Sequence, residues 1–167
     1  MNTPCRGVVR SLTMGDPRVA IERVYREHRA KLWRSLVAFT GDPHAAEDAL
    51  AETFAQALAR GEGVERWDAW VWRTAFRVAT GELGRRERPT RVMDPRSYEL
   101  PAPIDHLVSA LAQLSPKQRL SVVLHDYADR PTDEIAQTLG SSRATVHVRL
   151  SQGRRRLRAM LKEDDDA

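Results

Sequence analysis

Apolar residues recur every three or four positions along most of the chain, and this spacing is typical of amphipathic helices. The pattern predicts a first helix over about residues 17–39 and a second that begins with Asp42 as its cap and Pro43 as its first residue. A third predicted helix covers about residues 67–86. No stretch alternates strictly between apolar and polar residues, as a half-buried strand would. The N-terminal half is therefore predicted to consist of three helices.

The helical spacing stops between residues 87 and 103, where Pro89, Pro95, Pro101 and Pro103 interrupt a polar stretch. Such a composition is typical of a linker. The sequence thus predicts an all-α protein of two small helical domains joined by a flexible linker. The expected divisions are a disordered extension at 1–15, a first domain at 16–88, the linker at 89–103, a second domain at 104–162 and an acidic tail at 163–167.

The second domain contains a strong helix-start sequence. Ser115 is followed by Pro116 and, three residues after the cap, by Gln118, a combination that forms a capping box with proline at the first helical position. The apolar residues that follow keep helical spacing and are expected to form the core face of one continuous helix. These residues are Leu120, Val123, Leu124 and Tyr127.

Residues 131–161 have the pattern of a helix-turn-helix. Thr132 is predicted to cap a short helix, and Gly140 can take the left-handed conformation that ends it. Ser141 or Ser142 then caps a second helix. In a helix-turn-helix this second helix enters the DNA major groove.

The second helix of this motif has two distinct faces at 100° per residue. One stripe is expected to face the protein and consists of Val146, Leu150, Gly153 and Leu157. The opposite side and its flanks carry small, hydrogen-bonding and basic residues, which suit base edges and phosphates. They are Ala144, Thr145, His147, Val148, Ser151, Gln152, Arg155 and Arg158.

Composition narrows the class of protein. The chain of 167 residues has a net charge of +4, with arginines clustered at 85–91 and 154–158, where a polyanion can dock. Its single cysteine, Cys5, allows no internal disulfide, and no apolar run reaches membrane-spanning length, so a reduced, cytoplasmic protein is expected. A Gly-Lys-Ser phosphate loop and zinc-ligand spacings are both missing from the sequence. We therefore expect a protein that is not an enzyme and needs no metal or cofactor.

Three stretches, in order, resemble bacterial sigma factors of the small, two-domain extracytoplasmic-function (ECF) group. Residues 44–57 resemble the family's "AED…ETF" helix, and residues 70–79 resemble its "WL-aromatic-R-x-A" helix. The third stretch runs from Leu114 through the helix-turn-helix to Leu150. The resemblance covers about residues 19–161 and implies a factor that binds RNA polymerase core enzyme and promoter DNA. It also implies an anti-sigma factor in trans and no membrane insertion.

The resemblance assigns roles to particular positions. Its second helix would bind RNA polymerase through Glu47, Asp48, Glu52 and Gln56. Its third helix and the arginines after it would bind the −10 element through Arg73, Phe76, Arg77, Thr80, Arg85, Arg86 and Arg88. The helix-turn-helix would bind the −35 element through Arg143, Ala144, Thr145, His147, Val148, Arg149, Ser151, Gln152, Arg154 and Arg155.

The chain departs from the family in both predicted DNA readers. Phe76-Arg77 stands where many members have Arg-Asn, and Gly81 stands at a position that is usually acidic. These changes predict an altered −10 preference and weaker promoter melting. In the recognition helix, Val148 can touch a thymine methyl and Gln152 can hold adenine, which predicts an A·T step in the −35 element.

Two other functions compete with the sigma-factor interpretation. A stand-alone helix-turn-helix regulator would use the same recognition helix but would use the N-terminal half to dimerise. A metal-dependent nuclease built on Glu47 and Asp48 has only a pair of helix-face acids in its favour. Within the third helix, Trp70 and Trp72 are interpreted as core residues in preference to base-stacking wedges.

Overall fold

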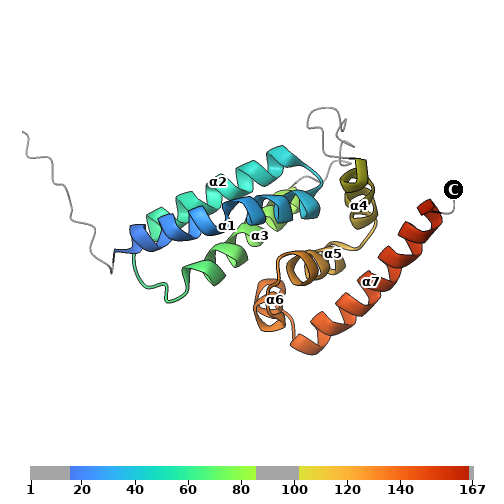
Figure 1. The fold of residues 1–167 in the computed structure, drawn as a ribbon. Coiled ribbons are helices and arrows are strands. Elements are labelled where there is room, and N and C mark those ends of the chain that lie inside the picture. Colours follow the sequence, from blue (N-terminus) through green and yellow to red (C-terminus); the bar gives the residue numbers. More distant parts are fainter. Residues whose placement is uncertain (1–15, 86–101, 166–167) are drawn as a thin grey trace, which may run out of the picture.

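The structure, a computed structural model, describes residues 16–85 and 102–165. Within those two ranges the regular structure is entirely helical, which confirms the predicted all-α class (Figure 1). None of these helices is long and apolar enough to cross a membrane. The elements are α1 (Pro17–Thr40), α2 (Pro43–Arg60), α3 (Trp67–Arg85), α4 (Ala102–Ala112), α5 (Pro116–Val122), the π-helix η2 (Val123–Tyr127), α6 (Thr132–Leu139) and α7 (Arg143–Asp165).

The predicted extension at 1–15 lies outside the described residues, as does nearly all of the predicted linker. The first two helices begin and end where the sequence predicts. The Asp16 side chain accepts a hydrogen bond from the Arg18 backbone N–H at 2.8 Å, and Gly41 ends α1 at a φ of 71°. Asp42 caps α2 by accepting from the backbone N–H of His44, with Pro43 at the first position.

The helix starts of the second half are mostly as predicted. The capping box of Ser115 and Gln118 is present at the start of α5. The Ser142 hydroxyl accepts from the Thr145 backbone N–H at 3.1 Å, so Ser142 caps α7. The prediction that Thr132 caps α6 is wrong. Pro131 occupies the cap position with extended backbone, at φ −66° and ψ 148°, and Thr132 is already the first helical residue.

The predicted continuous helix after Ser115 changes to a π-helix over Val123–Tyr127. Two backbone hydrogen bonds that span more than four residues accompany the change. The Ala128 N–H donates to the Val123 carbonyl at 3.0 Å, and the Arg130 N–H donates to the Leu124 carbonyl at 2.8 Å. The inserted residue rotates the end of the helix. Tyr127 is consequently 43% exposed, and the prediction that it belongs to the core is wrong.

The first three helices form a bundle with a dense apolar core. Leu32, Phe39 and Phe76 are fully buried within it. The rings of Phe39 and Phe76 meet edge to face with centroids 5.6 Å apart, and Trp72 stacks on Phe76 at 6.3 Å. Trp72 is only 3% exposed, which confirms its interpretation as a core residue.

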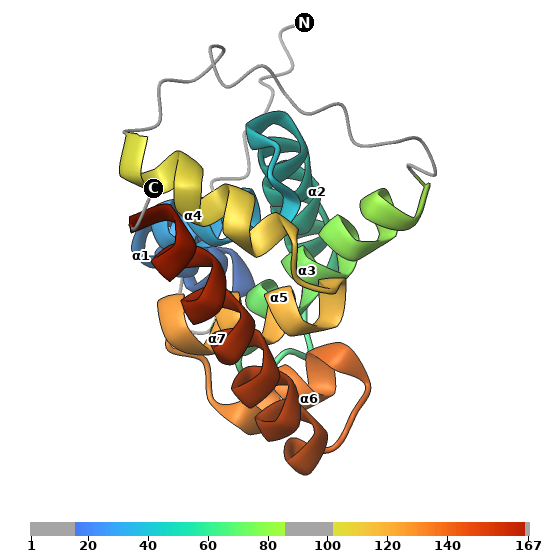
Figure 2. The ribbon, with the colours of Figure 1, turned by 90° about the vertical axis from the view of Figure 1, so that its right-hand side faces the viewer.

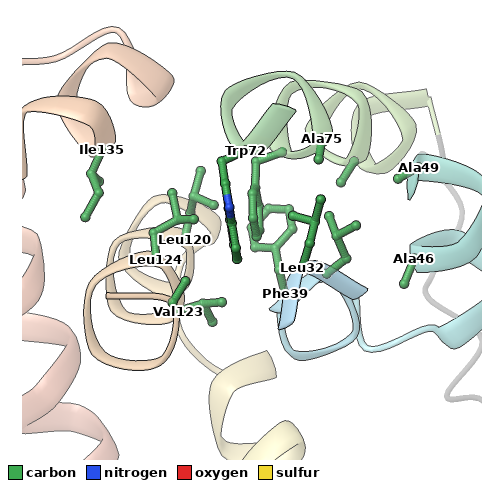
Figure 3. Close-up of a cluster of buried hydrophobic side chains, with 14 of the residues drawn as sticks. Leu32, Phe39, Ala46, Ala49, Trp72, Ala75, Leu120, Val123, Leu124 and Ile135 are labelled. Atoms are coloured by element: carbon green, nitrogen blue, oxygen red, sulfur yellow. The ribbon is translucent and has the colours of Figure 1, made fainter. Parts of the chain in front are cut away.

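The two halves of the chain share this core. Figure 3 shows Trp72 of α3 between the Phe39 side of the bundle and Leu124 of the second half. Helix α4 packs on both α1 and α7, and α3 packs on α6 (Figure 2). The half-buried Arg119 side chain joins the halves as well, because it donates from Nη1 to the Phe39 carbonyl at 2.8 Å. In this structure the two predicted domains are therefore docked on each other.

Candidate nucleic-acid interface

Helix α7 presents one face to the protein and the other to solvent, as its sequence predicts. Val146 and Leu150 are buried against the rest of the helix-turn-helix, and Leu157 continues the buried stripe. On the opposite side Val148 is 54% exposed. The other exposed members of the predicted −35 set are Arg143, Ala144, His147, Ser151, Gln152 and Arg155, and Thr145 is half-buried.

Gly153 sits where α7 crosses α5. It lies in the middle of a helix, and a Cβ added to it would lie 2.9 Å from Cγ2 of Val122. Ordinary contacts between carbon atoms are about 3.5–4.0 Å. The absence of a side chain at this position thus allows the close approach that holds the recognition helix against α5.

Two predicted phosphate contacts take part in the fold itself. Arg149 donates to the Ser141 hydroxyl at 3.0 Å across the turn of the motif. Arg154 donates from Nε to the Asp126 carboxylate at 2.9 Å, and this hydrogen bond lowers the pKa of Asp126 from its ordinary value. Both arginines consequently position α7, and Arg155 is the more available cation on the outer face.

Gln152 also has a partner within the protein. The Gln118 side-chain amide donates to Oε1 of Gln152 at 3.1 Å. A glutamine that holds adenine on two bonds needs its oxygen to accept from the base. An amide oxygen has two lone pairs, so Oε1 of Gln152 can accept from Gln118 and from an adenine at the same time.

The predicted −10 residues of α3 divide into exposed and buried ones. Arg73, Arg77 and Thr80 are exposed. Phe76 is 0% exposed, so the structure contradicts its assignment as a DNA contact. The reason is helical periodicity: Phe76 lies one turn after Trp72 and shares its buried face. Arg85 is the last residue of α3, and the predicted contacts Arg86 and Arg88 lie outside the described residues.

Helix α2 carries an acidic outer face. Glu47, Asp48 and Glu52 are exposed, whereas Ala46 and Ala49 on the other side are fully buried in the bundle. The predicted polymerase-binding residue Gln56 is half-buried and donates to Glu52 at 2.7 Å. The four predicted residues thus lie together on one polar surface of the N-terminal half.

A polar hollow of about 800 Å³ adjoins the start of α3, and none of the predicted polymerase- or DNA-binding residues lines it. It lies between the first turns of α1 and residues 61–68, and its lining includes Arg23, His28, Arg66 and Trp67. Gly61 and Gly63 have positive φ values of 72° and 83°. The two glycines of the Gly61-Glu62-Gly63 stretch were the available sequence signal, because glycine favours backbone conformations that other residues rarely adopt.

Comparisons with known proteins agree with this geometry. A family model described as sigma-70, region 4 matches residues 105–157, which contain the helix-turn-helix. The ECF RNA polymerase sigma factor SigL of Mycobacterium tuberculosis is 32% identical over 155 residues, which cover 84% of this chain and 88% of SigL. RNA polymerase sigma-E factor of Streptomyces antibioticus is 32% identical over 154 residues, which cover 86% of this chain and 86% of that factor.

Two solved structures share the fold. CnrH, solved in complex with the cytosolic domain of CnrY, superimposes with a TM-score of 0.68 at 23% identity, covering 88% of this chain and 90% of CnrH. The sigma factor RpoE, solved in complex with the anti-sigma factor NepR from Bartonella quintana, gives 0.67 at 20% identity, covering 87% of this chain and 96% of RpoE. These two structures share the fold, and the two sequence relatives, at 32% identity over most of the chain, establish that it belongs to the ECF family of RNA polymerase sigma factors.

Proposed function

We propose that the protein binds RNA polymerase core enzyme, directs it to a promoter through contacts with the −10 and −35 elements, and promotes transcription initiation. The observation that carries the proposal is the exposed face of α7, which presents small, polar and basic side chains on a helix-turn-helix within a chain of the ECF family. The protein would act by binding, without a cofactor, in the cytoplasm where the polymerase works.

Helix α7 would read the −35 element in the major groove. His147, Val148 and Ser151 lie on the exposed face at positions suited to base edges, and Val148 can contact a thymine methyl. Arg143 and Arg155 would bind phosphates. Arg149 and Arg154 would support these contacts by holding the helix in place through Ser141 and Asp126.

Helix α3 would follow the −10 strand. Arg73, Arg77 and Thr80 are exposed along it, and Arg85, Arg86 and Arg88, which follow in the sequence, would bind phosphates. Phe76 is removed from the proposed surface because it belongs to the core. The hollow at the start of α3 is lined by five acidic side chains as well as by Arg23, Arg66 and Trp67, so no contact with the DNA strand is assigned to it.

Helix α2 would dock on the polymerase through Glu47, Asp48, Glu52 and Gln56. An acidic surface of this kind fits a basic partner surface and accelerates association at low salt. A Glu52→Lys variant should therefore reduce the association rate with core polymerase. The matched control is Glu62→Lys, which makes the same charge change at an exposed position in the loop after α2.

An anti-sigma factor is the expected regulatory partner. The structural neighbour RpoE is described in complex with the anti-sigma factor NepR, and the chain shares the fold of that neighbour. We extend to this chain the same class of partner, supplied in trans.

The function is tested by in vitro transcription with core polymerase on a promoter library. Transcripts that start downstream of a shared two-part motif are the expected result. The alternative, a stand-alone regulator, predicts that the protein fails to co-elute with core polymerase and binds a palindromic duplex as a dimer. That pair of results would refute the sigma-factor function.

A further inference from the structure

The side chain of Gln118, at the start of α5, is held in one direction by two hydrogen bonds. Its Oε1 accepts from the Ser115 backbone N–H at 3.4 Å, as part of the capping box, and its Nε2 donates to Oε1 of Gln152 at 3.1 Å. A backbone N–H can only donate, so the Gln118 oxygen must face Ser115 and its amide nitrogen is left to face α7. The capping box thus fixes which end of the Gln118 amide meets Gln152.

The same polarity is imposed on Gln152. The Gln118 nitrogen offers only N–H groups, so the atom of Gln152 that lies against it must be the amide oxygen. The amide nitrogen of Gln152 consequently points away from its contact with α5. Gln152 is exposed on α7, whereas Gln118 is half-buried. An exposed amide on the recognition helix therefore has a direction that is set from the neighbouring helix.

The close approach of α7 to α5 brings the two glutamines together. Gly153 follows Gln152, and a Cβ built on it would lie 3.7 Å from both the Cβ and the carbonyl oxygen of Gln118. Val122, one turn further along α5, makes the closest approach to the same glycine. The backbone of α7 thus lies directly against Gln118. The contact between the glutamines follows from the packing of two helices.

An amide that is held in one direction distinguishes bases better than one that rotates freely. In the major groove adenine presents the N7 acceptor beside the N6 amino donor, and glutamine matches them with its nitrogen and its oxygen. Oε1 of Gln152 retains a lone pair for the N6 amino group while it accepts from Gln118. Because Oε1 is fixed on the α5 side, Gln152 offers its donor and acceptor in a single order. A freely rotating Gln152 would offer both orders.

We propose that Gln118 is a positioning residue for promoter recognition, which holds the Gln152 amide in one direction and so sets the base preference at one position of the −35 element. The proposal rests on the proposed sigma-factor function, in which α7 reads that element. Gln118 acts through Gln152 and makes no base contact of its own. A hydrogen bond between neutral groups is worth a factor of roughly two to ten, and Gln118 should raise the preference of Gln152 for adenine by about that factor.

The test needs a variant that keeps the capping box and loses the donor. Gln118→Glu does this, because a glutamate oxygen can still accept from the Ser115 backbone N–H but a carboxylate cannot donate to Gln152. The Gln152 amide must then turn its nitrogen toward α5 and its oxygen away. The order of donor and acceptor that Gln152 offers to DNA is reversed, while the start of α5 is retained.

Two control variants isolate the other effects of this substitution. Ser115→Ala removes the hydroxyl that caps α5 and leaves the backbone N–H that orients Gln118. Lys117→Gln makes the same change in net charge as Gln118→Glu, at the neighbouring exposed position, and leaves both glutamines in place. The first control reports the effect of a weaker cap, and the second reports the effect of a more negative surface on DNA binding.

Base preference is measured with holoenzyme, assembled from core polymerase and each variant, on promoters whose −35 element is randomised. Gln152→Ala first identifies the position that Gln152 reads, because the preference is lost there. At that position Gln118→Glu should lower the preference for adenine roughly two- to tenfold, with the preferences at other positions unchanged. Both controls should keep the parent preference at every position. An unchanged preference in Gln118→Glu would overturn the proposal.

A double variant separates positioning from a general structural effect. In the Gln152→Ala background Gln118 has no amide to orient, so Gln118→Glu should cause no further change in base preference. An equal change with and without Gln152 would refute the positioning role. If the parent holoenzyme forms but selects no promoter sequence, the sigma-factor function fails instead.

Nuclear magnetic resonance of the free, full-length protein tests the contact without polymerase. Gln152→Ala should move the side-chain amide proton signal of Gln118 upfield, because that proton loses its acceptor. Ser115→Ala should leave the signal close to its position in the parent protein. If Gln152→Ala leaves the signal in place, Gln118 does not hold Gln152, and the positioning role fails whatever the result with holoenzyme.

Discussion

Replacing Gly153 by alanine perturbs the closest contact in the helix-turn-helix half. The new Cβ would lie 2.9 Å from Cγ2 of Val122, which is closer than an ordinary carbon contact by about 0.6–1.1 Å. Val122 is β-branched and 7% exposed, so its methyl group has little room to move. Helix α7 must therefore shift away from α5 or Val122 must leave its preferred rotamer.

The expected cost follows from two opposing terms. Forcing an extra methyl group into a packed interior costs about 1–3 kcal/mol. Alanine is favoured over glycine in a helix interior by about 1 kcal/mol. Gly153→Ala should therefore lower the free energy of unfolding by about 1 kcal/mol. Val122→Ala alone removes two methyl groups and should cost about 1.6 kcal/mol at ~0.8 kcal/mol per group.

The double variant Gly153→Ala/Val122→Ala decides between close packing and a simple glycine effect. The new methyl group would fill space that the valine vacates, so the double variant should be at least about 1 kcal/mol more stable than additivity predicts. Urea unfolding of the four proteins measures this coupling. The same series should show weaker −35 duplex binding for Gly153→Ala and recovery in the double variant.

Gly81→Ala is the matched control for helix propensity. Gly81 is exposed in α3, and nothing lies within 4 Å of a Cβ added there. This substitution should stabilise the protein by up to about 1 kcal/mol. If the Gly153 and Val122 effects add within about 0.5 kcal/mol, the close approach of α7 to α5 is refuted.

Three further predictions concern caps, pH and DNA. Ser115→Ala removes the capping box of α5 and should cost about 1 kcal/mol in urea unfolding, whereas Ser115→Asp should retain most of the stability. The hydrogen bond from Arg154 lowers the pKa of Asp126 below its ordinary value, so this pair stabilises the fold above about pH 4 and is lost as pH falls through the folded-state pKa. Asp126→Asn should therefore flatten acid unfolding curves. Arg155→Ala should weaken duplex binding similarly on all sequences and reduce the salt slope by about 1, and a sequence-dependent loss would contradict its role as a phosphate contact.

Most of the local structure could be predicted because its causes are local. Asp42 with Pro43, Ser115 with Gln118, and Gly140 each satisfy backbone groups a few residues away, so the helix limits follow from short sequence motifs. The faces of α7 follow from periodicity in the same way. Two local predictions were wrong. Pro131 takes the cap position that was predicted for Thr132, and the π-helix over Val123–Tyr127 leaves Tyr127 outside the core.

The candidate site was predicted less completely than the helices. The −35 face could be assigned because exposure and chemistry coincide on α7. On α3 the resemblance to the family assigned a DNA contact to Phe76, although its ring is buried against Phe39. The polar hollow beside Trp67 was missed because its walls come from α1 and from the loop after α2.

The sequence by itself determined the all-α class, the helix-turn-helix and the family, because these depend on periodicity, caps and motif order. Only the tertiary structure decided the docking of the two halves. Arg66 donates to Glu134, which lies 68 positions away, and both are residue types that are common on protein surfaces. Nothing in a local pattern indicates which distant charge a side chain will meet. The pairing depends on the shared core around Trp72, which brings α3 and α6 together.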